Sequence, residues 1–252
     1  MKIALALDTL QKSYDYIATF SNVAGIEGEF IIQKHEDGEL DICEITLFNC
    51  NISEEAFINK FNTESKLHGN TGYIFILSSD DKIVSGNFIS DIQITTIFTD
   101  DSGKLNIKIN GWLHTSSKGF YQIIKKRLTQ GLQEYGEWKK LPAENVQGWL
   151  EDVAKSRTLT DDISNKVVTI HSDDLDEEDK FYCALGEIVN GIGGYFGRCP
   201  NSLSDCLHGD FGIKGNFTLN WIDHKKYKEK FPVHFNYIVE TFADNKKTLK
   251  LL

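Results

Sequence analysis

Short apolar runs separated by polar turns dominate the first 112 or so residues of the chain. The runs are rich in β-branched and aromatic side chains, and sequences such as EDGE, SSDD and DDSG divide them. They lie at 27–34, 40–48, 72–79, 90–100 and 104–114. The last run alternates apolar and polar residues with period two, as a half-buried strand does. This pattern predicts a region made mainly of strands.

Helices are expected inside and after this region. In the segment 53–61, Ser53 is a candidate N-cap, and the two glutamates after it complement the positive end of a helix dipole. The segment 119–135 has apolar residues at helical spacing, and we expect its basic triplet KKR to face solvent. The apolar positions are Phe120, Ile123, Ile124, Leu128 and Leu132, and the triplet is Lys125, Lys126 and Arg127. A further helix is expected at 142–156, where Pro142 suits the first turn.

The pattern changes after the polar segment SRTLTDDISN at 156–165, so a domain boundary is expected near residues 157–165. Strand and helix patterns then alternate, which favours parallel strands joined by right-handed crossovers. The expected strands are 166–172, 216–223 and 246–252, and the expected helices are 176–190 and 232–245. The sequence therefore predicts two domains. These are a strand-rich α+β domain at 1–160, and an α/β domain at 165–252 with a three-stranded parallel sheet and flanking helices.

Composition narrows the class of protein. The chain has 252 residues, 40% of them hydrophobic, and a formal net charge of −10, which argues against a nucleic-acid-binding protein and suits a cationic partner. Five cysteines without a CxxC pair favour reduced thiols. The N-terminal apolar run is broken by Asp8 and is short for a signal peptide, and no apolar stretch approaches the roughly 18 residues of a membrane helix. We therefore expect a cytoplasmic protein.

The segment GGYFGRCPNSLSDCLHGDFG at 193–212 carries most of the candidate chemistry. Gly191 and Gly193 match the start of a dinucleotide fingerprint, but Phe196 stands at its third position and the glycines follow a predicted helix. A phosphate-binding enzyme that uses the loop 191–197 is thus the weaker alternative. Six residues separate Cys199 from Cys206, more than the roughly two to four of a zinc knuckle, so we interpret both thiols as buried packing residues. No metal or cofactor is expected.

The same segment resembles the barstar family of ribonuclease inhibitors. Tyr195-Phe196-Gly197, followed after three residues by NSLSDCL at 201–207, resembles the family's loop and short helix, which ends in an aspartate and a leucine. The resemblance continues through FTLNW, which ends at Trp221, and through IVETFADN and TLKLL. Together these motifs span about residues 166–252 in the family's order. The resemblance implies a barstar-like fold for the C-terminal domain.

Barstar-like proteins bind ribonucleases and block their active sites inside the producing cell. The resemblance implies that Asp205 mimics an RNA phosphate in a cationic cleft and that Tyr195 covers the cleft with a flat face. Asp210 and Phe211 would lie on the same rim, and Asp244 would add an acidic contact. The implied partner-binding set is Tyr195, Asn201, Ser204, Asp205, Gly209, Asp210, Phe211 and Asp244. A bacterial immunity protein against a basic nuclease toxin, without enzymatic activity, is the expected function.

Several positions depart from the family pattern. Asn201 stands where the family has an acid, Ser204 where it has a tryptophan, and Arg198 in place of an acidic residue. Pro200 occupies a usual leucine position. These departures favour a different target, or a retained fold without inhibition, which would make the chain a general protein-interaction module. Asp205 could also pair locally with His208 on the same helix face. An enzyme is disfavoured because no G-x-S-x-G or HExxH motif occurs.

Overall fold

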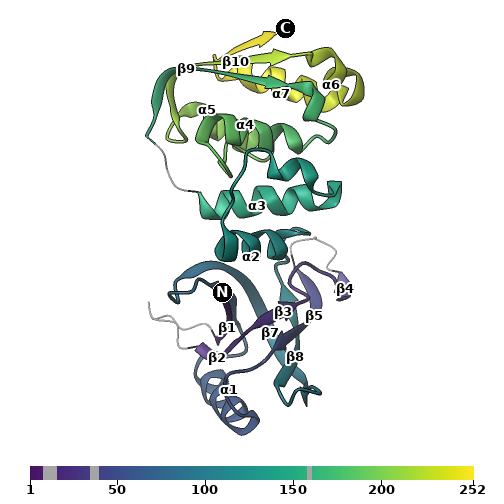
Figure 1. The fold of residues 1–252 in the computed structure, drawn as a ribbon. Coiled ribbons are helices and arrows are strands. Elements are labelled where there is room, and N and C mark those ends of the chain that lie inside the picture. Colours follow the sequence, from purple (N-terminus) through teal and green to yellow (C-terminus); the bar gives the residue numbers. More distant parts are fainter. Residues whose placement is uncertain (8–15, 35–39, 158–160) are drawn as a thin grey trace. The chain divides into compact units, whose positions relative to one another are not determined.

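The computed structural model describes residues 1–7, 16–34, 40–157 and 161–252 (Figure 1). The chain divides into two units, Met1–Tyr121 and Gln122–Leu252, so the boundary lies earlier than the expected 157–165. The reason is the packing of helix α3 (Val146–Ser156), whose apolar side chains belong to the same core as the C-terminal strands. The polar segment after α3 is therefore a connection within the second unit, and its residues 158–160 lie outside the described residues.

The first unit contains an eight-stranded antiparallel sheet. Seven strands run in the order β2-β1-β6-β7-β8-β5-β3, and β4 pairs with β5. The bounds are β1 Lys2–Leu7, β2 Tyr16–Phe20, β3 Asn22–Ala24, β4 Ile31–Lys34, β5 Asp41–Phe48, β6 Gly72–Leu77, β7 Ile83–Thr99 and β8 Leu105–Leu113. Four of the five predicted runs contain a strand, the run 90–100 covers the second half of β7, and β1, β2 and β3 lie outside the runs. In β8, buried and half-buried residues alternate over most of the strand, as its period-two pattern predicted.

Helix α1 (Glu54–His68) accompanies this sheet. Ser53 is its N-cap, as predicted, and the Ser53 hydroxyl accepts a hydrogen bond from the backbone N–H of Ala56 at 3.3 Å. The helix runs seven residues beyond the predicted segment, which ended at Phe61. It buries Phe57 and Phe61, and the Phe57 ring lies 6.4 Å from that of Phe20. These aromatic contacts anchor the helix on the sheet.

The second unit contains the predicted three-stranded parallel sheet, in the order β11-β10-β9. Its strands are β9 Ile163–His171, β10 Ile213–Ile222 and β11 Thr248–Leu251. Its helices are α2 Phe120–Gln130, which begins in the first unit, α3, α4 Lys180–Asn190, α5 Pro200–His208, α6 His224–Lys230 and α7 Pro232–Asp244. Short 3-10 helices occur at η1 Glu137–Lys140, η2 Ala143–Asn145 and η3 Ser172–Asp174. None of the helices among the described residues is long and apolar enough to cross a bilayer.

One face of the parallel sheet carries the core of the second unit. Strand β10 buries Phe217, Leu219 and Trp221, and the residues between them are more exposed. Trp221 is fully buried, its ring centroid lies 5.0 Å from that of Phe181 on α4, and its indole N–H donates to the Ser172 hydroxyl at 3.0 Å. Apolar alternation in β10 thus directs one row of side chains toward the helices. Phe196 and Trp221 are both fully buried core residues.

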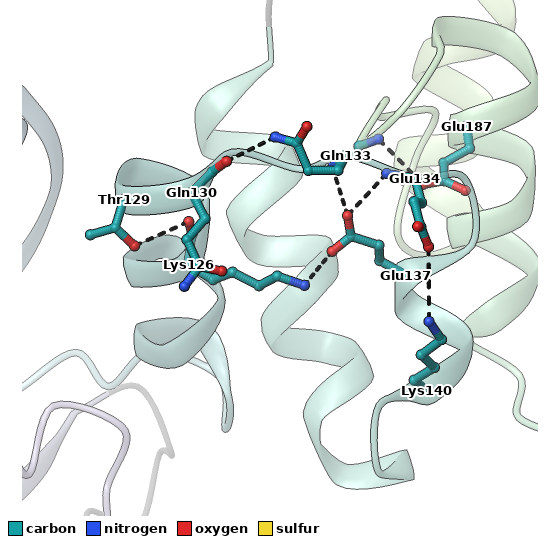
Figure 2. A network of polar contacts seen from close by, with 9 residues as sticks. Lys126, Thr129, Gln130, Gln133, Glu134, Glu137, Lys140 and Glu187 are labelled. Atoms are coloured by element: carbon teal, nitrogen blue, oxygen red, sulfur yellow. Dashed lines mark hydrogen bonds and ion pairs between the residues drawn. The ribbon is translucent and has the colours of Figure 1, made fainter.

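A polar network fixes the connection between α2 and η1 (Figure 2). The Glu137 carboxylate accepts hydrogen bonds from the backbone N–H groups of Gln133 (2.7 Å) and Glu134 (3.1 Å), and it pairs with Lys126. The buried Glu187 carboxylate of α4 accepts from the Gly136 N–H at 2.7 Å and from the Trp138 indole at 2.8 Å. These bonds satisfy backbone donors in the connection and join it to α4.

The prediction that the basic triplet 125–127 faces solvent is wrong for Arg127. Lys125 and Lys126 are exposed, but the Arg127 guanidinium is bidentate on Asp152 of α3, with Nε–Oδ2 at 2.8 Å and Nη2–Oδ1 at 2.9 Å. The Asp152 side chain is fully buried and that of Arg127 is 21% exposed. Burial raises the pKa of Asp152, and the bonds from Arg127 oppose that shift. Arg127, which was predicted to face solvent, therefore provides a partner for the buried Asp152 carboxylate.

Candidate functional site

Local sequence explains why α5 forms where it does. Pro200 occupies the first helical turn, where its missing N–H costs nothing, and Cys199 is the N-cap. The Ser202 hydroxyl accepts from the backbone N–H groups of Arg198 (2.8 Å) and Cys199 (3.0 Å), which satisfies donors at the start of the helix. Gly209 ends the helix with a φ of 131°. The helix is thus closed at both ends by its own residues.

The two faces of α5 differ in burial. Leu203, Cys206 and Leu207 are buried in the core of the unit, whereas Asp205 is exposed. Within the described parts of the chain, no hydrogen bond or ion pair engages the Asp205 carboxylate. The His208 ring instead places Nδ1 2.8 Å from the Ser204 carbonyl oxygen, so the local Asp205–His208 pair considered from sequence is not formed. The Asp205 carboxylate is therefore available to a partner.

Other residues of the predicted set are also accessible to solvent. Asn201, Asp210 and Asp244 are exposed, and Ser204 and Gly209 are half-buried. The Ser204 hydroxyl accepts from the Asn245 side-chain amide at 2.9 Å, which joins α5 to the end of α7 beside Asp244. The tertiary structure thus brings together the α5 and α7 segments, which the resemblance had placed on one surface.

Asp162 holds the turn that follows α5. Its carboxylate accepts hydrogen bonds from the backbone N–H groups of Asp210 and Gly212, both at 2.9 Å. Asp210 has a φ of 65°, a left-handed conformation that aspartate tolerates better than most residues. Sequence reasoning missed Asp162, because it lies 48 residues before Asp210 and no local pattern connects them.

Tyr195 is buried, which differs from the flat exposed face that the resemblance implied. It is only 9% exposed, and burial raises the pKa of its phenol. The Arg157 guanidinium from the end of α3 lies 5.6 Å from the Tyr195 ring centroid and 5.3 Å from that of the half-buried Phe211. The two rings lie 6.2 Å apart. A cation–π contact from a remote segment therefore covers the tyrosine.

These rings line a pocket of about 270 Å³ in the second unit. Arg127 and Arg157 also line it, as do Gly193 and Gly194 of the loop. The pocket therefore combines residues from α2, α3 and the segment 193–212. Neither arginine was assigned to a site from the sequence, and the only available signal was their positive charge in an acidic chain.

Packing explains the glycines of this loop. A Cβ atom at Gly194 would lie 2.6 Å from the carbonyl oxygen of Gly186 on α4, and one at Gly186 would lie 2.3 Å from the Gly194 oxygen. Both positions thus require glycine for close approach of two backbones. The Gly193 N–H donates to Glu187 at 3.3 Å and the Gly194 N–H to the Gly191 oxygen at 2.8 Å. These two amides are therefore satisfied within the protein and do not form a phosphate cradle.

The two cysteines of the segment have different surroundings. Cys206 is buried as interpreted, and burial raises the pKa of its thiol to about 12. Cys199 is exposed, which corrects the interpretation of both as packing residues. Burial acts to raise the pKa of Cys199, but hydrogen bonds at the start of α5, first from Ser202, hold it below its usual value. Among the described residues, no group of three or more His, Cys, Asp or Glu side chains could hold a metal ion.

Comparisons with known proteins identify no relative of this chain. No family model, no curated protein and no solved structure matches the chain.

Proposed function

We propose that this chain is a non-enzymatic inhibitor of a basic ribonuclease, and that the exposed face of α5 is its contact surface. The observation that carries the proposal is the Asp205 carboxylate. It is exposed, and no described residue engages it by a hydrogen bond or ion pair. A ribonuclease cleft that binds RNA phosphates offers arginine and lysine donors, which suit such a carboxylate.

The order of elements in the second unit supports a barstar-like arrangement. The motifs of the resemblance fall on a loop, the short helix α5, strand β10 ending near Trp221, helix α7 and the closing strand β11. The second unit also contains α2 and α3, which precede the segment covered by the resemblance. The family-like part is therefore built onto additional helices.

The rigid mounting of α5 favours binding with little ordering cost. Leu203 and Leu207 anchor the helix in the core, and the bond from Asn245 to Ser204 joins it to α7. A partner would meet a carboxylate whose backbone is already fixed, so little conformational entropy would be lost on binding. The net charge of −10 would speed encounter with a basic partner at low salt.

The buried position of Tyr195 modifies the contact surface that the resemblance implied. Because the Tyr195 ring lies under Arg157, the proposal rests on Asp205, with Asp210 and Asp244 as further acidic contacts. Tyr195 then supports the loop from inside. This arrangement differs enough from the family pattern to favour a target other than the small secreted ribonucleases.

The test is a matched capture experiment in a native bacterial lysate that co-expresses the neighbouring genes. The full chain, Asp205→Ala and Asp101→Ala are compared, since Asp101 is an exposed acid in a turn of the first unit. We expect the wild type and Asp101→Ala to retain a basic nuclease and to inhibit its cleavage of RNA. Asp205→Ala should weaken binding by about 30-fold or more, the scale of interfacial charge pairs, the barnase–barstar complex included.

Two results would count against the proposal. Equal binding by Asp205→Ala and Asp101→Ala would remove α5 from the contact. Capture of a partner whose activity is unchanged by the bound chain would favour the general interaction module instead.

A further inference from the structure

The pocket beside Tyr195 has an unusual charge for this protein. None of the ten described residues that line it is acidic, although the chain carries a net charge of −10. Two of the lining residues are arginines, Arg127 and Arg157, and they come from α2 and from the end of α3. A local cationic site on an acidic chain points to an anionic ligand.

Arg157 provides the less constrained positive charge. Its Nη1 donates to the Ala154 carbonyl oxygen at 3.2 Å, and no carboxylate within the described ranges lies at ion-pair distance from it. The guanidinium carbon also lies 5.6 Å from the Tyr195 ring centroid and 5.3 Å from that of Phe211. The planar guanidinium group presents its N–H donors as a fork, which matches the oxygens of a carboxylate or a phosphate.

Arg127 provides a second donor at the same pocket. Its Nε and Nη2 atoms bind the buried Asp152 carboxylate, and its Nη1 has no hydrogen-bond partner among the residues that the structure describes. The ion pair neutralises most of the charge of Arg127 but fixes its position. The two arginines therefore differ in role, since Arg157 supplies net charge and Arg127 supplies a positioned N–H group.

The volume of the pocket limits the size of the ligand. The pocket has a volume of about 270 Å³. This is slightly below the range of about 300–1,000 Å³ for pockets that hold drug-sized ligands. There is room for an anion with a short organic body, and the aliphatic side chains of Leu132 and Ile192 would contact that body.

We propose that this pocket binds a small organic anion, a phosphate monoester or a carboxylate, through the guanidinium groups of Arg157 and Arg127. The site is distinct from the contact surface on α5, since neither Asp205 nor Asp244 lines the pocket. It also differs from a glycine-rich phosphate loop, because the Gly193 and Gly194 amides already have partners within the protein. These glycines shape the pocket wall and the arginines recognise the ligand.

The experiment titrates the full chain with glycerol 3-phosphate, with succinate and with neutral glycerol. Binding is followed through the amide NMR signals of Gly193 and Gly194. We expect saturable shifts with at least one of the two anions and none with glycerol. The anion that binds more tightly identifies the ligand as a phosphate ester or a carboxylate.

Variants assign the binding to the pocket. Arg157→Gln should weaken it by about tenfold or more, because a charge-assisted hydrogen bond is lost, and Arg157→Lys should fall between this variant and the wild type. Lys225→Gln removes an equal charge from an exposed residue outside the pocket lining and should change the affinity by less than about twofold. Asp205→Ala should leave the titration unchanged, so this test and that of the proposed inhibitor function can fail independently.

Two outcomes would overturn the proposal. One is the absence of saturable shifts with either anion at concentrations up to about 10 mM, which is ten times a millimolar dissociation constant. The other is an equal loss of affinity in Arg157→Gln and Lys225→Gln, which would indicate nonspecific attraction to positive charge. Circular dichroism of each variant verifies that it is folded, and Arg157→Lys provides the comparison if Arg157→Gln is not.

Discussion

The exposed face of α5 and the pocket lined by Arg127 and Arg157 both include residues of the segment 193–212, but the first presents a negative charge and the second presents positive charges. Asp205 is an acid without a described partner on a helix whose other face is buried. In the pocket, by contrast, Tyr195 lies under Arg157, and the neighbouring Arg127 is bound to a buried acid. A residue supplied by a distant helix makes the difference, because no described residue covers Asp205 in this way. The comparison shows that a local motif does not determine which of its side chains remain available.

The largest expected effect comes from breaking the ion pair on the pocket side. Arg127→Met should lower the free energy of unfolding by about 3–5 kcal/mol, because the fully buried Asp152 carboxylate would lose its partner. Urea denaturation followed by tryptophan fluorescence measures this change. Asp152→Leu in the Arg127→Met background should recover most of the loss, since both charges are then absent.

Arg157→Gln is the control for that experiment. Its guanidinium is exposed and contacts aromatic rings, so its removal should cost no more than about 1 kcal/mol. Equal destabilisation by the two arginine variants would contradict the different roles assigned to Arg127 and Arg157.

The next effect separates the two faces of α5. Leu207→Ala should destabilise the protein by about 2–5 kcal/mol, because Leu207 is fully buried and its truncation leaves a cavity. Asp205→Ala should change the free energy of unfolding by less than about 0.5 kcal/mol, as surface substitutions generally do. A large loss of stability in Asp205→Ala would mean that the carboxylate has a structural role and would weaken its assignment as a contact residue.

The smallest effect concerns a buried imidazole that contacts two tyrosine hydroxyls. His234 lies between two tyrosine hydroxyls, with Nε2 2.8 Å from Tyr182 Oη and Nδ1 2.6 Å from Tyr227 Oη. Burial lowers the pKa of His234, and the charge of Asp179 opposes this shift. The folded protein therefore favours the neutral imidazole, so the stability it contributes is fully present above the unfolded pKa of about 6.5 and is lost as the pH falls below that value.

Urea denaturation at about pH 7.5 and about pH 5.5 tests this sign. The wild type should lose more stability between these values than His234→Gln does. Burial raises the pKa of Asp179, which gives a contribution of opposite sign toward lower pH, and the comparison with the variant removes that background. An identical pH dependence in both proteins would show that His234 does not titrate with folding in this range.

Part of the candidate site was predictable from local sequence. The spacing of Leu203, Cys206 and Leu207 defines one helical face, and Pro200 and Gly209 mark the ends of α5. Helical periodicity places Asp205 on the opposite face of the helix from these apolar positions. The role of Asp205 toward a partner stays a prediction.

By itself, the sequence determined the five predicted strand runs of the first unit, the cap of α1, and the three parallel strands with helices α4 and α7 between them. These features follow from hydrophobic periodicity and end signals, which act over a few neighbouring residues. Only the tertiary structure decided that the unit boundary lies at Tyr121, that Arg127 pairs with Asp152, and that Arg157 covers Tyr195. Such contacts join residues far apart in the chain, and their free energy depends on burial that no local pattern encodes.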